Sequence, residues 1–249
     1  RRRRARARGR GAREGAEGRG LLDEYYTPPE AIKLIWQELG KLVDFNKSDL
    51  TVLEPSIGIG RFFYYAPDLV KELGHLVGYE INPTAVRIAR MLTPPDTEIN
   101  IKHFEDIFVD QYGNAKDFMK VFDVVVGNPP YGEHRGLYLG LGEEPHISRY
   151  EEYFLKRSLD LTKEGGYVAM VLPSGFLRSA ATNTKMRIAA VGKLQIAYRL
   201  PNRIFGTTDI GTDILVFKKE KGDVQELSND LYFTEHPENI LGEKVEVKG

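Results

Sequence analysis

Two spacings of hydrophobic residues take turns along the middle of the chain. Stretches with apolar residues three or four positions apart, typical of one helix face, are separated by short apolar runs rich in β-branched residues, typical of buried strands. Strands that alternate with helices indicate an α/β fold with a doubly wound, mostly parallel sheet. The predicted helices cover residues 28–43, 61–73, 83–92 and 150–161, and the predicted strands cover residues 51–54, 75–80, 98–102, 121–126, 167–172, 194–200 and 213–218.

Acidic residues follow the first three predicted strands, where such sheets bind their ligands. The first strand runs into residues 54–60, which contain Glu54, Pro55, Ser56, Gly58 and Gly60. Glycines at such a turn let the backbone approach a ligand closely. Their spacing differs from the dinucleotide pattern G-x-G-x-x-G.

The second strand ends at Glu80 and Ile81, and the third is followed by Asp106 and Ile107. Glu80 is placed to accept hydrogen bonds from a ribose diol. An acid-lined pocket favours a nucleoside that carries an amino acid and a sulfonium over a pyrophosphate. The alternative is that the glycines only permit a tight turn and that the acids are solvated loop residues.

A rigid tetrapeptide, Asn128-Pro129-Pro130-Tyr131, directly follows the buried fourth strand. Two prolines fix φ and remove two N–H donors, so the segment presents carbonyl oxygens. These oxygens and the Asn128 side chain could hold both hydrogens of an exocyclic amine, while Tyr131 could stack on a planar ring. The alternative is a proline-rich turn with a tyrosine in the core.

These motifs together resemble the S-adenosylmethionine-dependent DNA adenine-N6 methyltransferases of the gamma motif order, from about residue 25 to residue 219. Tyr26, Thr27 and Pro28 resemble the upstream cofactor motif, and residues 54–60 the cofactor loop. The resemblance implies that Glu80 and Ile81 bind the ribose, that Asp106 and Ile107 bind the cofactor adenine, and that Asn128 also borders the cofactor. It implies a Rossmann-like, seven-stranded sheet with the last strand antiparallel.

In such enzymes residues 128–131 would be the catalytic motif, acting on an adenine flipped out of DNA. Phe205 is the candidate for an aromatic side chain against that base. Residues 236–242 also resemble large phage or plasmid proteins that join a methyltransferase to a helicase. We expect S-adenosylmethionine as the cofactor and no metal, because the five histidines are scattered without ligand spacing.

Charge is unevenly distributed in these 249 residues, whose net charge is −1. Residues 1–20 carry +7, so the remainder is acidic and is a poor polyanion binder as a whole. Residues 165–208 contain no acid and carry +6, which makes them the candidate DNA face, with Arg178, Lys185 and Arg187 as predicted contacts. Ordinary surface basicity is the alternative. The glycine-rich stretch 132–149 could close over a base or be a disordered insertion.

The expected organisation is a low-complexity arm over residues 1–20, a catalytic domain over 21–221 and an acidic linker, or the start of a missing domain, over 222–249. The arm could touch phosphates, but a linker or remnant is the favoured interpretation. Too little chain follows residue 219 for a target-recognition domain, so we expect recognition of DNA to come from another domain or subunit. No membrane span or signal peptide is visible, which predicts a cytoplasmic protein of bacterial or phage origin.

Three other functions compete. The same tetrapeptide serves enzymes that methylate a glutamine amide in release factors, and relatives that act on ribosomal RNA. Tyr26-Thr27-Pro28 and the long stretch after Tyr131 favour DNA. The second is a non-catalytic module of the same fold that binds DNA or scaffolds a complex, which the intact motifs argue against. The third, a Rossmann dehydrogenase, is disfavoured by the glycine spacing.

Overall fold

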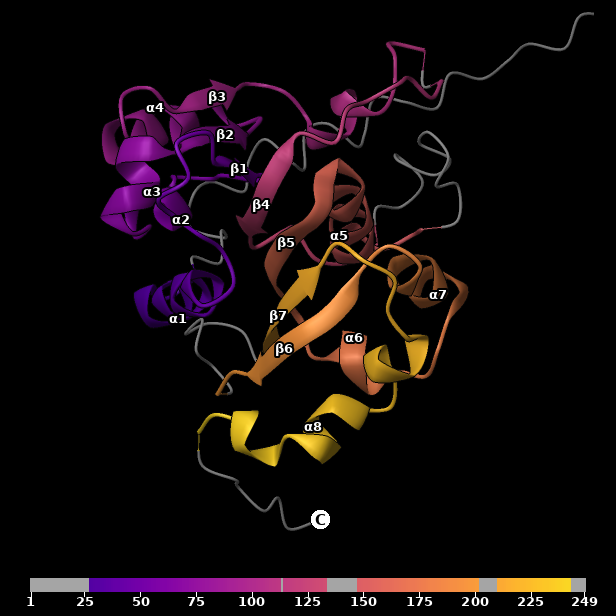
Figure 1. The fold of residues 1–249 in the computed structure, drawn as a ribbon. Helices are drawn as coiled ribbons and strands as arrows, with labels where there is room; N and C mark the ends of the chain where they lie inside the picture. The colour runs from indigo at the N-terminus through magenta and orange to yellow at the C-terminus, as the bar shows by residue number, and fades with distance from the viewer. Residues whose placement is uncertain (1–26, 113, 134–146, 202–209, 243–249) are drawn as a thin grey trace, which may run out of the picture.

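A seven-stranded sheet organises the chain in the computed structural model, which describes residues 27–112, 114–133, 147–201 and 210–242 (Figure 1). The strand order is β3-β2-β1-β4-β5-β7-β6. Neighbours from β3 to β5 pair in parallel, whereas β7 lies antiparallel between β5 and β6. The predicted doubly wound sheet with an antiparallel last strand is therefore confirmed. The strands are β1 (Thr51–Glu54), β2 (His75–Tyr79), β3 (Glu98–Asn100), β4 (Phe122–Gly127), β5 (Thr162–Pro173), β6 (Lys193–Arg199) and β7 (Thr212–Lys218).

Helices cover both faces of the sheet (Figure 1). The central strands alternate their side chains between two cores: Val124 and Val126 of β4 pack with α1, and Val125 packs with α5. A strand buried on both faces needs apolar residues at every position, as the run in β4 provides. The helices are α1 (Pro29–Gly40), α2 (Arg61–Tyr64), α3 (Asp68–Leu73), α4 (Pro83–Leu92), α5 (Tyr150–Leu161), α6 (Gly175–Arg178), α7 (Asn183–Ala189) and α8 (Leu231–Glu235), with 3-10 turns η2 (Phe104–Ile107), η3 (Val224–Leu227) and η4 (Pro237–Asn239).

The predicted helix over residues 61–73 is two helices, α2 and α3. Pro67 separates them, because it lacks an N–H and disfavours a helical conformation at Ala66 before it. The sequence predicted a single helix because the apolar spacing continues on both sides of Pro67, but a helix does not continue through this proline.

Residues 224–241 pack against the β6 edge, where the sequence indicated a linker (Figure 1). Leu227 and Phe233 are buried in the core that also contains α5 and α7. The guanidinium of Arg199, at the end of β6, donates two hydrogen bonds to Asp230, at 2.8 and 2.9 Å, and lies 4.3 Å from the centre of the Phe233 ring. Two buried residues in short irregular turns leave no periodic pattern, which is why the sequence did not reveal this packing.

None of the described helices is long and apolar enough to cross a membrane. The arm over residues 1–20 and the end of the chain, residues 243–249, lie outside the described residues, so the predicted domain boundaries stay predictions.

Candidate active site

A cavity of about 640 Å³ lies at the carboxyl ends of β1, β2 and β4. Parallel neighbouring strands end at the same edge of a sheet, so residues distant in sequence converge there. Eleven of the predicted site residues line this cavity: Thr27, Glu54, Pro55, Ser56, Gly58, Glu80, Ile81, Asn128, Pro129, Pro130 and Tyr131. Pro28, Gly60, Asp106 and Ile107 do not line it, and Tyr26 and Phe205 lie outside the described residues.

The turn after β1 requires its two glycines for different reasons. Both have positive φ, +51° at Gly58 and +83° at Gly60, which side-chain-bearing residues rarely adopt. A Cβ atom on Gly58 would meet no atom within 4 Å, whereas one on Gly60 would lie 2.7 Å from Cγ2 of Thr93. Gly60 therefore allows α4 to approach closely, and Gly58 leaves open space beside the cavity.

Glu54 is a buried acid without a hydrogen-bonding partner on one oxygen. Its side chain lies at the end of β1 and the residue is 2% exposed. Oε2 has no hydrogen-bond partner among the described residues. Burial, and secondarily the nearby charge of Glu80, raises the pKa of the Glu54 carboxyl well above its usual range. A buried, unpaired acid at a cavity wall is suited to receive a cationic group.

The carboxylate of Glu80 accepts hydrogen bonds from two backbone N–H groups, one of them in the turn after β1. Oε2 accepts a hydrogen bond of 3.1 Å from the Gly58 N–H, and Oε1 accepts one of 2.7 Å from the Asn82 N–H. Each carboxylate oxygen keeps a further lone pair for a ligand hydroxyl. The predicted role of Glu80 as a diol acceptor agrees with this orientation, and Ile81, 55% exposed, borders the same cavity.

The acid that lines the cavity after β3 is Glu105, one residue before the predicted Asp106. Asp106 is exposed and does not line the cavity, and Ile107 packs against the core. Phe104 and Glu105, both buried, line the cavity in their place. The cause is the 3-10 turn η2, in which successive side chains point about a third of a turn apart. Spacing along the sequence could not tell which member of the Glu105-Asp106 pair faces inward.

The 128–131 segment leaves β4 with its first and last side chains bonded to each other. The Tyr131 hydroxyl donates to Oδ1 of Asn128 at 2.5 Å and also lies 3.0 Å from a second acceptor, the carbonyl oxygen of Val171. Ser56 Oγ donates to the Asn128 carbonyl oxygen at 3.2 Å, which joins this segment to the turn after β1. Burial, followed by the charges of Glu151 and Asp213, raises the pKa of the Tyr131 hydroxyl, so it stays protonated.

Other lining residues were not identified from the sequence. Tyr150 and Phe154 lie four positions apart on α5 and so face the cavity together. Their spacing on a predicted helix that follows the Asn-Pro-Pro-Tyr motif was an available signal. Ile210, which precedes β7, carried no such signal.

The predicted basic DNA face is largely neutralised in its described part. Lys185 is fully buried: its ammonium donates to the Ser179 carbonyl oxygen at 2.7 Å, and burial lowers its pKa to about 8. It therefore has no surface to offer a phosphate, and its predicted DNA contact is wrong. Arg178 lies 3.7 Å from a carboxylate oxygen of Asp230. The neutralising acids come from outside residues 165–208, so local composition could not reveal them.

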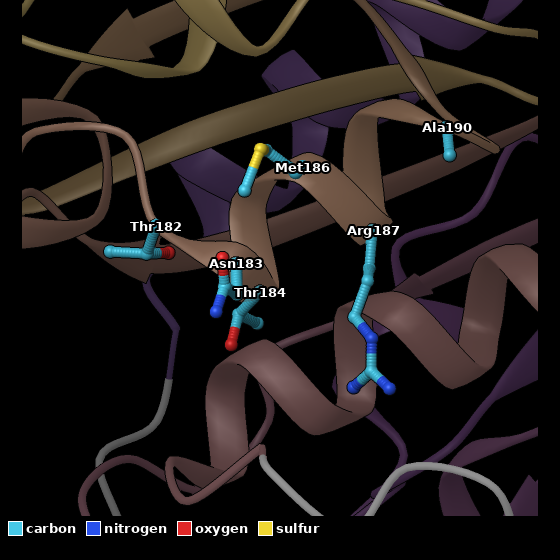
Figure 2. A pocket seen from close by; sticks show the side chains of 6 residues that line it. All are labelled: Thr182, Asn183, Thr184, Met186, Arg187 and Ala190. Carbon is cyan, nitrogen blue, oxygen red and sulfur yellow. The ribbon is translucent and has the colours of Figure 1, made fainter.

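Arg187 lines a separate surface hollow of about 630 Å³ on α7 (Figure 2). Its other lining residues are Thr182, Asn183, Thr184, Met186 and Ala190. The lining contains no Asp or Glu and shares no residue with the first cavity. No group of three or more potential metal-ligating side chains occurs within the described residues.

Known proteins share sequence similarity with most of this chain. The chain is 29% identical to "Defense against restriction protein B" of Escherichia phage P1 over 220 residues, which cover 86% of this chain and 9% of the phage protein. It is 26% identical over 238 residues to the type I restriction enzyme EcoEI methylase subunit of Escherichia coli, covering 88% of this chain and 46% of the subunit. The chain thus spans less than half of each of these relatives.

A solved structure shows the same fold. The type I restriction-modification system methyltransferase subunit from Streptococcus thermophilus matches with a TM-score of 0.60 and 22% identity, over 79% of this chain and 44% of that chain. The family described as N-6 DNA Methylase matches residues 12–247, which include every motif described above. Because that match extends over nearly the entire sequence, the chain belongs to the N-6 DNA Methylase family.

Proposed function

We propose that this chain is the catalytic domain of an S-adenosylmethionine-dependent enzyme that methylates the N6 amine of adenine in DNA. The observation that carries the proposal is the meeting, in one cavity, of the buried Glu54, the oriented Glu80 and the 128–131 segment. Membership of the N-6 DNA Methylase family supports it. That relatives are methylase subunits of restriction enzymes supports it further.

The residues present fit the cofactor. The unpartnered oxygen of Glu54 matches a cationic amino-acid end, and Glu80 offers acceptors for the ribose hydroxyls. The space beside Gly58 admits the ligand close to the backbone. Phe104 and Glu105, on η2, are placed to contact the cofactor base in the role expected of Asp106 and Ile107. When bound, the cofactor supplies a methyl group on a positively charged sulfur.

The 128–131 segment would hold the target amine. Oδ1 of Asn128 and a proline carbonyl oxygen accept its two hydrogens, which directs the nitrogen lone pair toward the methyl group. The amine of adenine is unreachable inside a duplex, so the base must leave the stack to enter the cavity. Catalysis then rests mainly on positioning and on exclusion of water.

Recognition of a DNA sequence would come from outside the described domain. The chain spans 46% of a methylase subunit and 9% of the phage protein, so much of each relative has no counterpart here. Arg178 and Arg199 are paired with acids and Lys185 is buried, so these three described residues offer little basic surface to DNA. We infer that a further domain or subunit supplies most contacts to DNA.

Replacement of Asn128 tests the proposal. We expect Asn128→Ala to lower methyl transfer to DNA by about 10²-fold or more, because the amine loses its acceptor. Calorimetry should give the same cofactor affinity for the variant and the wild type. Transfer at the wild-type rate by the variant would refute the role of Asn128, and absence of cofactor binding by the wild-type protein at millimolar concentration would refute the proposed function itself.

A further inference from the structure

Gly132, directly after the 128–131 segment, has both of its backbone polar groups bonded to the start of α5. Its N–H donates to Oε2 of Glu151 at 2.8 Å. Its carbonyl oxygen accepts from the Tyr150 N–H at 2.9 Å. The φ angle of Gly132 is +103°, a conformation that favours glycine, so the chain turns sharply here. The end of the 128–131 segment is therefore fixed to a helix.

The Glu151 carboxylate is built into this junction. The residue is 2% exposed, and a buried carboxylate is costly unless its oxygens are bonded. Oε2 is bonded to Gly132, and Oε1 accepts from Nε of Arg149, whose side chain remains 45% exposed. An antiparallel bridge between Glu133 and Arg149 closes the same junction. No sequence motif includes Glu151.

The 128–131 segment depends on such external anchors. Pro129 and Pro130 have no N–H, so the backbone can donate few hydrogen bonds of its own. One end is held by Ser56, whose hydroxyl donates to the Asn128 carbonyl oxygen. The other end is held through Gly132. Displacement of reacting groups by about 1 Å can lower a rate about 10²-fold, so these anchors bear on chemistry.

We propose that Glu151 is a positioning residue for methyl transfer: through Gly132 its carboxylate fixes the orientation of Asn128 and Tyr131 in the cavity. The proposal rests on the proposed function and names a residue on which that site depends. Glu151 is not among the residues that line the cavity; it acts through the backbone that it holds.

Three variants of the full chain separate this role from a general structural one. Glu151→Ala removes the acceptor for the Gly132 N–H. Glu151→Gln keeps one oxygen for Gly132 while Arg149 can turn to solvent. Glu152→Ala is the matched control, because Glu152 is the adjacent acid on the same helix turn and has no hydrogen bond to residues 128–132 within the described structure. The measurements are cofactor affinity, single-turnover methyl transfer to DNA, and amide hydrogen exchange of residues 128–133.

We expect Glu151→Ala to lower the transfer rate about 10²-fold with cofactor affinity changed less than about threefold. Glu151→Gln should restore most of the rate, and Glu152→Ala should match the wild type. Exchange at residues 128–133 should accelerate only in Glu151→Ala. Pro129 and Pro130 contribute no amide, and Gly132 is the amide in this segment that loses its acceptor when the Glu151 carboxylate is removed.

Wild-type transfer in Glu151→Ala, or equal losses in Glu151→Ala and Glu152→Ala, would overturn the inference. If the wild-type protein transfers no methyl group, hydrogen exchange decides whether Glu151 holds Gly132; if it also binds no cofactor, the proposed function fails. Unchanged exchange in Glu151→Ala then overturns the positioning role. If Glu151→Ala does not fold, a rate in Glu151→Gln as low as that of Asn128→Ala would also contradict it.

Discussion

At the scale of single residues, Glu54 is the clearest sign that this cavity was shaped for a ligand. A carboxyl group that is 2% exposed and has an unpartnered oxygen destabilises the folded protein when it ionises. Because its pKa is raised by burial, folding stability falls as pH rises above the carboxyl's ordinary range, near 4.5. A cation bound beside Glu54 would stabilise the ionised carboxylate and so lower the free-energy cost of its ionisation.

Glu54→Gln should therefore change stability and ligand binding in opposite directions. At neutral pH we expect the variant to unfold at a higher temperature than the wild type, since a neutral amide avoids the free-energy cost of ionising or protonating this buried carboxyl, and to bind the cofactor at least about 10-fold more weakly. Calorimetry and thermal unfolding measure the two effects. If the unfolding temperature and the cofactor affinity of the variant both rose or both fell, Glu54 would not be a buried acid that binds the cofactor.

The pH dependence of binding gives a control. Binding of a cation selects ionised Glu54, so cofactor affinity of the wild type should fall as pH is lowered through the raised pKa of this carboxyl, with proton release on binding. The glutamine variant should lose that part of the pH dependence.

Some site residues could be predicted from the sequence because the backbone alone places them. Glu54, Glu80 and Asn128 lie at the ends of parallel strands, and any such residue reaches the same edge. Glu105 faces the cavity and Asp106 faces solvent because of the backbone conformation of the 3-10 turn η2. Lys185 is buried where its ammonium packs against the Phe176 ring. Side-chain direction in irregular segments requires tertiary structure.

At the scale of elements, the apolar spacing predicts the regular parts well. Helices α4 and α5 have the predicted bounds, and strands β4, β6 and β7 lie within one residue of them at each end. Residues 224–241 are the main difference, since Leu227 and Phe233 pack without periodicity and Asp230 joins them to Arg199. These residues therefore pack on the core, although the sequence indicated a linker or the start of a further domain there.

Phe233→Ala tests that packing. Phe233 is 3% exposed and its ring lies under the Arg199 guanidinium, so we expect the free energy of unfolding to fall by about 3 kcal/mol. Urea unfolding measures the change. Tyr112→Ala, which removes an aromatic side chain that is 79% exposed, should have little effect. Equal, negligible effects of the two substitutions would mean that residues 224–241 do not stabilise the domain.

At the scale of the whole molecule, the strand order explains why one cavity can serve both partners in a methyl transfer. β1 lies between β2 and β4, so the acids after β1 and β2 border one side of the cavity and the 128–131 segment borders the other. The near-zero net charge conceals paired charges on this domain. The chain spans under half of each relative described, which leaves room for recognition of DNA elsewhere.

Transfer of a tritium-labelled methyl group from S-adenosylmethionine to separate pools of DNA, RNA and protein, followed by nucleoside analysis, tests the central claim most directly. The account predicts label in N6-methyladenine of DNA with the wild-type chain, and about 10²-fold less or lower still with Asn128→Ala. Label in ribosomal RNA or in a protein glutamine would contradict it.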